Sequence, residues 1–506
     1  MPPRLRTTLA CTAANCFGLL HALSFAPWNL PWLQVLALAG LFALAQAVAK
    51  KPRAAAGLGF CFGLGWFTLG VHWVYISMHS YGFIPAPLAA LATVAFTAFL
   101  SLYPALALGV TFAAAKPLAA RWLLAAPAAW AGSEWLRGWL LTGFPWLASG
   151  YAHTDGPLAG FAAVLGIHGV TVLAAFVAGA LALAAVGRAG PRRVGVAGLA
   201  AAALLRGAGQ ALRSIVWTQP VGVPISVRLI QGNIPQDTKF TAGSMERIAG
   251  TYLRLLNEQK ADLVVLPEGV FPIPAQYLPR SLTDALAAFV RERNAALIFG
   301  VFLEDPPGEF TNSAVALTPD REEAQRYGKR HLVPFGEFVP WGFRWFVDAM
   351  RMPLGDQQRG APYQPPLEAA GQRIAINICY EDLFGAEIRR AWDDPARAPT
   401  LLLNMSNLAW FDDSIALPQH LQISRMRTLE TGRPMLRATN SGATAVVDAR
   451  GNVVAELPFV TEAVLAHEVQ GYAGLTPYLR WGDAPALALF VVLAVAGIAA
   501  GRRGRP

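Results

Sequence analysis

The chain has 506 residues, of which 54% are hydrophobic and only 14% are charged. Soluble globular domains carry about 25% charged residues, so this composition excludes a single soluble globule. The formal net charge of +9 would suit a nucleic-acid partner, but the positions of the basic residues favour a different explanation.

Apolar runs that are long enough to cross a membrane fill most of the first 210 residues and recur near the C-terminus. A helical span needs about 20 mainly apolar residues. Such runs lie at 8–25, 31–49, 57–78, 87–115, 122–136, 157–187, 194–210 and 484–500. We therefore expect a membrane α-helical bundle of about eight spans, seven of them in a domain at 1–210 and the last at 484–500.

Basic residues gather at the two termini and in every second short loop. They are Arg4, Arg6, Lys50, Lys51, Arg53, Lys116, Arg121, Arg188, Arg192, Arg193, Arg502, Arg503 and Arg505. The opposite short loops carry only Arg137. The positive-inside rule then places both termini in the cytoplasm and residues 211–483 outside it, so the charge is a topology signal. No nucleic-acid partner is expected.

Residues 222–472 have the composition of a soluble domain. Short apolar runs predict strands at 227–231, 262–267, 296–300, 312–318, 373–379, 400–404, 435–440, 443–448 and 453–457, and helical patterns lie at 243–259, 281–294 and 416–431. Continuous Val, Ile and Leu runs between helices indicate sheets that are buried on both faces. We expect one α/β domain in which two mixed sheets lie between layers of helices.

Cys379 is the only cysteine of this soluble block, because Cys11, Cys16 and Cys61 lie in apolar runs near the N-terminus. Outside the cytoplasm, a cysteine without a partner in its own domain is a candidate reactive thiol. The plainer interpretation is a small buried hydrophobe, since free cysteine is among the most buried residue types. Composition alone favours that plainer interpretation, so the residues around Cys379 must decide whether its thiol is reactive.

Three residues with functional chemistry follow predicted strands: Glu268, Lys329 and Cys379. Singly, the glutamate reads as a turn or cap residue and the lysine as a surface charge. Together they suit nucleophilic catalysis, because a thiol needs a base and a nearby positive charge to attack an ester carbonyl. His331 lies near Lys329 in the sequence, but nothing else indicates that it forms a Cys-His dyad. The sequence also has no Cys-x-x-Cys motif, His-x-x-x-His pair or glycine-rich phosphate loop, so no metal or cofactor is expected.

The motifs around these residues resemble the nitrilase superfamily and, within it, the membrane-embedded apolipoprotein N-acyltransferase family. The resemblance extends over nearly the whole chain. It rests on SEWLRGW at 133–139, TGFPW at 142–146, QGNIPQ at 231–236, LPE at 266–268, KRHLVPFGE at 329–337 and CYE at 379–381. It implies an extracytoplasmic nitrilase-like αββα sandwich at 222–472, with catalytic residues Glu268 as base and acid, Lys329 as electrostatic stabiliser and Cys379 as nucleophile.

The resemblance also implies supporting residues around this triad. Glu337 and Glu381 match carboxylates that assist it, the former as a second acid/base group or as a residue that orients Lys329. Tyr380 would shape the pocket beside the thiol. Phe240 and Trp410 fall at supporting or substrate-binding positions, although Phe240 stands where a tryptophan is common. Leu408 likewise replaces the usual aspartate of the SNLAWF run at 406–411.

The implied reaction is ping-pong acyl transfer from a membrane phospholipid through a Cys379 thioester to the α-amino group of a diacylglyceryl-modified apolipoprotein. The resemblance also implies a bacterial inner membrane, a periplasmic catalytic domain and a monomer. Two alternatives use the same features. One is a membrane-tethered amidase of the nitrilase type, in which water accepts the acyl group. The other is a membrane protein that binds lipoproteins without catalysis.

Overall fold

The computed structural model describes residues 3–188, 190–239, 241, 243–344 and 356–503. The chain divides into two compact units. The helical unit comprises 1–75, 85–216 and 476–506, and the α/β unit comprises 76–84 and 217–475. The short segment 76–84 therefore belongs to the α/β unit, although helices of the other unit flank it in the sequence.

Where the structure describes it, the helical unit is built from eight longer helices and several short helical segments. The longer helices are α1 (Pro3–Ala22), α2 (Pro31–Val48), α3 (Pro52–Val71), α5 (Ala86–Ala114), α7 (Ala126–Arg137), α8 (Ala162–Val186), α9 (Gly190–Ser214) and α16 (Ala484–Arg503). The short segments are α4 (Val74–Ile76), α6 (Leu118–Ala120), η2 (Arg121–Ala125), η3 (Leu140–Thr142), η4 (Ser149–His153), η5 (Pro157–Phe161) and α15 (Pro477–Trp481).

Six helices in the described part of the chain are long and apolar enough to cross a membrane. They cover 31–48, 52–71, 86–114, 157–186, 190–214 and 484–502. The expected spans at 8–25 and 122–136 are not among them. Helix α1 begins with Arg4 and Arg6 among polar residues. The run 118–137 is divided among α6, the π-helical segment η2 and α7, and it contains charged residues that include Glu134.

Glu134 is a fully partnered carboxylate inside the helical unit. Its side chain is 2% exposed. Oε1 accepts hydrogen bonds from Trp130 Nε1 at 3.0 Å and from Ser149 Oγ at 2.5 Å. Oε2 accepts from the Ser149 backbone at 2.9 Å and from Thr171 Oγ1 at 3.2 Å. A buried charge among apolar helices needs such partners, and here they join α7, η4 and α8.

The described residues of the α/β unit form two six-stranded sheets. The first runs β12-β1-β2-β3-β4-β5 and the second β11-β10-β9-β8-β7-β6. The first consists of β1 (Gln219–Gln231), β2 (Leu263–Val265), β3 (Ala296–Glu304), β4 (Phe310–Leu317), β5 (Gln325–Gly328) and β12 (Ala463–Ala473). The second consists of β6 (Leu367–Ala369), β7 (Gln372–Ile378), β8 (Leu401–Ser406), β9 (Met435–Thr439), β10 (Ala445–Val447) and β11 (Val453–Glu456).

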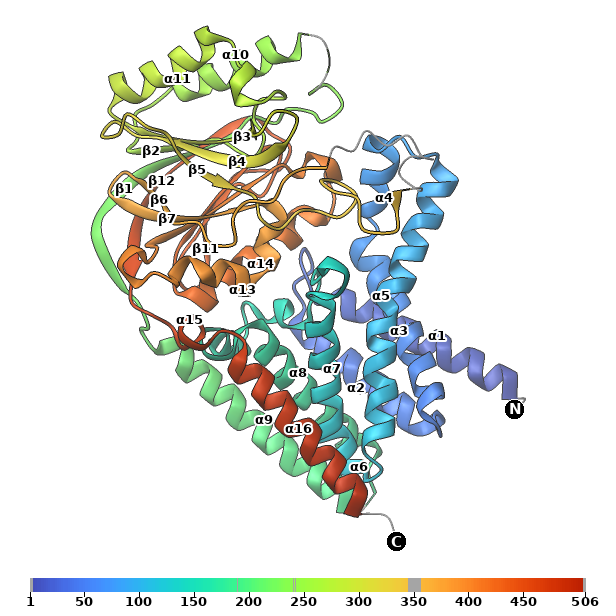
Figure 1. Ribbon diagram of the computed structural model, residues 1–506. Helices are drawn as coiled ribbons and strands as arrows, with labels where there is room; N and C mark the ends of the chain where they lie inside the picture. Colours follow the sequence, from blue (N-terminus) through green and yellow to red (C-terminus); the bar gives the residue numbers. More distant parts are fainter. Residues whose placement is uncertain (1–2, 189, 240, 242, 345–355, 504–506) are drawn as a thin grey trace. The chain divides into compact units, whose positions relative to one another are not determined.

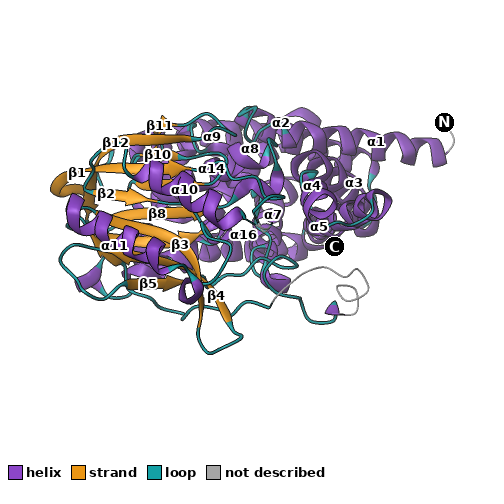
Figure 2. Ribbon diagram, turned by 90° about the horizontal axis from the view of Figure 1, so that it is seen from above, coloured by secondary structure: helices purple, strands orange, loops and turns teal. Residues whose placement is uncertain are grey.

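Helices cover the outer faces of both sheets. The α-helices of the unit are α10 (Ser244–Leu256), α11 (Arg280–Arg293), α13 (Gly385–Ile388) and α14 (Ala416–Thr431), and its short segments are η1 (Ser77–Tyr81), η6 (Ala275–Tyr277), η7 (Cys379–Leu383), η8 (Arg389–Trp392), η9 (Pro395–Arg397) and η10 (Leu408–Phe411). In Figure 1, α10 and α11 lie above the first sheet and α13 and α14 lie below the second, and in the view from above in Figure 2 α10 and α11 lie in front of the strands. The unit is the expected αββα sandwich.

Alternating residues of the strands build the core of this sandwich. Val227, Leu263, Ile298, Ile376 and Leu403 are among the side chains buried between the two sheets. The alternate residues of the first sheet, such as Val264 and Leu297, pack instead against α10 and α11. The three central strands of each sheet run parallel, β1-β2-β3 in the first and β7-β8-β9 in the second. Their carboxyl ends therefore lie at one edge, where functional groups gather in α/β folds.

Three strands were not expected from the sequence: β5, β6 and β12. All three lie at sheet edges. Edge strands bury fewer side chains, so they lack the continuous apolar runs that indicated the central strands. In β12 the burial alternates between buried, intermediate and exposed positions, and the strand pairs antiparallel with β1 along most of its length.

Candidate active site

The three predicted catalytic residues follow three different strands. Glu268 comes shortly after β2, Lys329 directly follows β5, and Cys379 opens η7 directly after β7. Two of these strands belong to the first sheet and one to the second. The site is thus assembled from both sheets of the sandwich.

Lys329 lies between two carboxylates. Its Nζ donates to Glu268 Oε1 at 3.1 Å and to Glu337 Oε1 at 2.6 Å. The lysine side chain is 1% exposed, and the carboxylates are 9% and 12% exposed. Burial alone would lower the pKa of Lys329, but Glu268 and Glu337 outweigh it and hold that pKa well above its ordinary value. The ammonium is a permanent positive charge.

Glu268 is held by neutral donors as well as by the lysine. Asn312 Nδ2 donates to Oε1 at 2.7 Å, and the backbone N–H of Asn407 donates to Oε2 at 2.8 Å. Glu337 is fixed in a similar way, because the backbone N–H of Val333 donates to its Oε2 at 2.9 Å. Both carboxylates therefore have defined orientations before any substrate arrives.

Cys379 has an unusual backbone and a shifted acidity. Its φ is +52°, a conformation that non-glycine residues rarely adopt. Burial raises the pKa of the Cys379 thiol well above its ordinary value. Glu268 and Glu337 raise the pKa further, and Lys329 lowers it. The resting thiol is therefore protonated, and it needs a base at the moment of attack.

A second lysine lies beside the first carboxylate and escaped the sequence analysis. Lys239 is 5% exposed, and its Nζ donates to the backbone carbonyl of Gly269, the residue after Glu268. Burial lowers the pKa of Lys239 to about 8, although Glu268 opposes that shift. The lysine adds positive charge near the predicted base and fixes the peptide that follows it.

Glu381 supports the turn that holds the cysteine. Its Oε2 accepts from the Ile378 backbone at 2.7 Å, and its Oε1 accepts from the backbones of Arg330 at 2.6 Å and His331 at 3.1 Å. Tyr327 adds a hydrogen bond to Oε2 at 3.1 Å. One carboxylate thus ties the loop after Lys329 to the strand end before Cys379.

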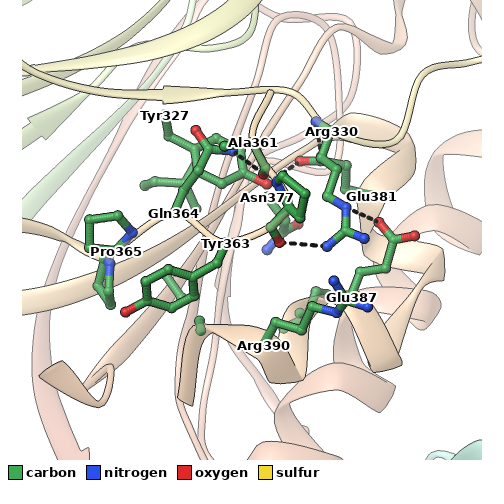
Figure 3. Close-up of a pocket in the computed structure, with 16 residues that line it drawn as sticks. Tyr327, Arg330, Ala361, Tyr363, Gln364, Pro365, Asn377, Glu381, Glu387 and Arg390 are labelled. Carbon is green, nitrogen blue, oxygen red and sulfur yellow. Dashed lines mark hydrogen bonds and ion pairs between the residues drawn. The ribbon is translucent and has the colours of Figure 1, made fainter. Parts of the chain in front are cut away.

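A cavity of about 40 Å³ borders this carboxylate. Figure 3 shows Tyr327, Asn377 and Glu381 in its wall together with Arg330 and Glu387. Arg330 Nη1 donates to the Pro362 carbonyl at 2.6 Å, and its Nε lies 3.9 Å from Glu387. Arg330 and Glu387 of this wall thus form an ion pair with each other.

We expect Glu381→Gln to lower the free energy of unfolding by about 3 kcal/mol, because hydrogen bonds to a charged group contribute about 1.5–3 kcal/mol each. The glutamine amide would also place an N–H group against backbone N–H donors. Thermal unfolding of the purified protein in detergent measures the change. Tyr327→Phe is the matched control, since it removes one bond to the same carboxylate and should cost less than about 1.5 kcal/mol. Equal stability of Glu381→Gln and the unaltered protein would contradict this role.

Tyr380 and Trp410, which were predicted to support the triad, each lie against a neighbouring aromatic ring. The ring of Tyr380 lies 5.3 Å from Phe384, edge to face, and the residue is 6% exposed. Trp410 is 38% exposed, and its ring lies 5.9 Å from Tyr81 of the segment 76–84. The Tyr81 hydroxyl donates to Asp412 in the same loop as Trp410. Phe240 lies outside the described residues.

His331 and Leu408 are accounted for by local packing. His331 stacks on Phe384 with ring centroids 3.5 Å apart, and its Nδ1 lies 3.0 Å from Glu387. Leu408 is 1% exposed, so an apolar side chain suits its position. In the described part of the chain, no group of three or more His, Cys, Asp and Glu side chains is placed to hold a metal ion.

Family models match both parts of the chain. The apolipoprotein N-acyltransferase N-terminal domain matches residues 17–180, and the carbon-nitrogen hydrolase domain matches residues 226–478. The chain is 51% identical to the apolipoprotein N-acyltransferase of Ralstonia nicotianae, covering 99% of this chain and 95% of the relative. It is 47% identical to that of Bordetella bronchiseptica, covering 96% of each chain. The solved structure of a mutant amidase of the nitrilase superfamily, from Nesterenkonia AN1, is similar with 19% identity and a TM-score of 0.37, covering 52% of this chain and 95% of the amidase.

Proposed function

Because the chain belongs to the apolipoprotein N-acyltransferase family, and its activity is therefore lipoprotein N-acylation, we propose that Glu268, Lys329 and Cys379 are the residues that perform this reaction. The observation that supports this assignment most is the buried Lys329 ammonium held between two carboxylates, with its charge acting on the Cys379 thiol. This arrangement supplies a base, a positive charge and a nucleophile.

In the first half-reaction, Cys379 Sγ attacks an acyl ester carbonyl of a membrane phospholipid while Glu268 takes the thiol proton. The Lys329 ammonium has three N–H groups. Two of them bond to Glu268 and Glu337, so the third can donate to the oxyanion that forms. The C–O bond then breaks, Glu268 returns the proton to the leaving alkoxide, and a lysophospholipid departs. The acyl group remains on Cys379 as a thioester.

In the second half-reaction, the α-amino group of the diacylglyceryl-cysteine at a lipoprotein N-terminus attacks the thioester. Glu268 accepts the amine proton, the C–S bond breaks, and the proton returns to the Cys379 thiolate. Glu337 bonds to Lys329 and to the Val333 backbone, which supports a role in orienting the lysine. Tyr380, Glu381 and Trp410 are proposed as supporting residues, and so is Phe240.

Chain connectivity and the basic residues that gather at the termini and in every second short loop support a periplasmic location for this chemistry. The α/β unit continues at both ends into apolar helices, α9 and α16, that are long enough to cross a membrane. Both lipid substrates favour the bilayer by about 0.8 kcal/mol for each buried CH₂ group. We place both termini in the cytoplasm and the α/β unit in the periplasm, with the protein in the bacterial inner membrane as a monomer. The amidase alternative is not favoured, because the full-length relatives are acyltransferases.

Mass spectrometry after incubation with phospholipid alone tests the assignment. We expect one acyl mass on the peptide that contains Cys379, with one lysophospholipid released for each modified protein. Addition of a diacylglyceryl peptide with a free amino group should remove that mass and produce the triacylated peptide. An acyl group on another residue, or product formed only when both substrates are present together, would overturn the thioester route.

A further inference from the structure

The backbone carbonyl of Cys379 receives two side-chain hydrogen bonds. His420 Nε2 on α14 lies 3.2 Å from this oxygen, and Asn404 Nδ2 on β8 also lies 3.2 Å from it. Asn404 is itself held, because its Nδ2 donates to Asn377 Oδ1 at 2.6 Å and its Oδ1 accepts from Ser406 Oγ at 2.6 Å. Two fixed donors therefore act on the main chain of the residue that adopts the rare positive φ.

The protonation of His420 follows from its other neighbour. Arg437 Nη2 lies 2.9 Å from His420 Nδ1. A guanidinium can only donate, so Nδ1 accepts and the proton of a neutral ring sits on Nε2, facing Cys379. Burial lowers the pKa of His420 well below its ordinary value, and the charges of Arg437 and Lys329 act in the same direction. The ring is therefore a neutral donor toward the cysteine.

Arg437 is fixed by residues around it. Its Nη1 lies 2.9 Å from Asp382, with both side chains 0% exposed, and its Nε donates to the Ala443 carbonyl at 3.1 Å. Ser424 of α14 bonds to both Arg437 and Asp382. Asp382 lies in η7, the same turn that Cys379 opens. The turn is consequently tied to α14 at both the cysteine and the aspartate, to β8 at the cysteine and to β9 at the aspartate.

We propose that His420 is a positioning residue for the nucleophile: its Nε2–H, fixed by Arg437, holds the Cys379 carbonyl so that the thiol keeps its geometry for attack. The dihedral angles of Cys379 determine where Sγ lies, and the two hydrogen bonds to its carbonyl restrict those angles. This inference rests on the proposed role of Cys379, and it adds a residue that touches neither substrate nor the thiol proton.

The test compares His420→Met, which removes the donor, with His420→Gln, whose Nε2 amide can reach the same carbonyl. We expect His420→Met to slow acylation of Cys379 by phospholipid roughly tenfold to a hundredfold, with an unchanged KM for the lipid. His420→Gln should stay within about fivefold of the unaltered protein, because the donor is kept. Alkylation of Cys379 by iodoacetamide, followed by mass spectrometry, should rank the variants in the same order.

Ile423→Ala is the matched control, because Ile423 is an apolar residue on the same helix and is 2% exposed. It should lower the temperature of thermal unfolding and leave the acylation rate unchanged. Unaltered acylation and alkylation rates in His420→Met would overturn the inference, and so would equally slow reactions in His420→Met and His420→Gln. If the unaltered protein forms no acyl-Cys379, the proposed function fails, whereas the alkylation rates still test the role of His420.

Discussion

Cys379→Ala is expected to abolish both acyl-enzyme formation and lipoprotein N-acylation. The methyl group cannot form a thioester, so phospholipid and acceptor would have to react directly, without the covalent intermediate. Loss of the nucleophile in enzymes of this kind costs roughly 10⁴-fold to 10⁶-fold in rate. The rate of N-acylation of a diacylglyceryl peptide, measured by mass spectrometry with purified protein in detergent, should therefore fall to background.

The chain supplies matched controls for this substitution. Cys11, Cys16 and Cys61 are free cysteines on α1 and α3 of the helical unit. Replacing these three by alanine should leave the N-acylation rate unchanged, and a thiol-reactive probe should still label the remaining Cys379. N-acylation by Cys379→Ala at more than about a hundredth of the normal rate would rule out Cys379 as the acyl carrier.

Glu268→Gln should trap very little acyl-enzyme, and it should slow N-acylation by roughly 10²-fold to 10⁴-fold, the range expected for loss of a general base. The thiol proton would have no acceptor during the attack on the ester. Lysophospholipid release and the acyl mass on Cys379, both measured over time with phospholipid alone, report this step directly.

The same variant should react faster with iodoacetamide. The Glu268 carboxylate raises the pKa of the Cys379 thiol, and the neutral amide removes that contribution while the charge of Lys329 remains. The thiolate fraction at a given alkaline pH therefore rises, and alkylation of Cys379 should reach its half-maximal rate at a lower pH than in the unaltered protein. Faster alkylation together with slower acylation would show that the variant has lost its base, because a damaged site would slow both reactions.

Glu292→Gln is the control, because Glu292 is an exposed carboxylate on α11. It should change neither reaction. Acyl-enzyme accumulation at the normal rate in Glu268→Gln would show that another group takes the thiol proton.

The sequence indicated Glu268 and Cys379 as candidate catalytic groups because each follows a strand, and Lys329 through the KRHLVPFGE motif at 329–337. Glu268 and Cys379 come after runs of Val, Ile and Leu whose burial on both faces is visible in the composition. Their convergence follows from the parallel strands, although the strand before Lys329 was not expected. The site roles themselves stay predictions until the variants are measured.

The buried polar residues behind Cys379 could not be predicted in the same way. His420 and Arg437 lie in a helix and a strand that are buried on nearly all sides, where the pattern gives no sign of which polar groups meet. Their contact joins two successive elements, α14 and β9, and the ion pair of Arg437 with Asp382 joins β9 to a turn 55 residues earlier in the chain. A histidine in a buried helix is also compatible with a purely structural role, so only the geometry distinguishes the two.

Because β1 pairs with β12, we expect the enzyme to become active only after β12 has been synthesised. These strands are the first and last of the α/β unit, and they pair from Gln219 with Ala473 to Gln231 with Ala463. Contacts between distant parts of a chain form slowly, because a long loop must close first. During synthesis, β12 emerges only shortly before the final apolar helix α16. The first sheet, which supplies Glu268 and Lys329, therefore stays incomplete until residues 463–473 have been synthesised, and a protein truncated before β12 would hold Cys379 in an incomplete α/β unit.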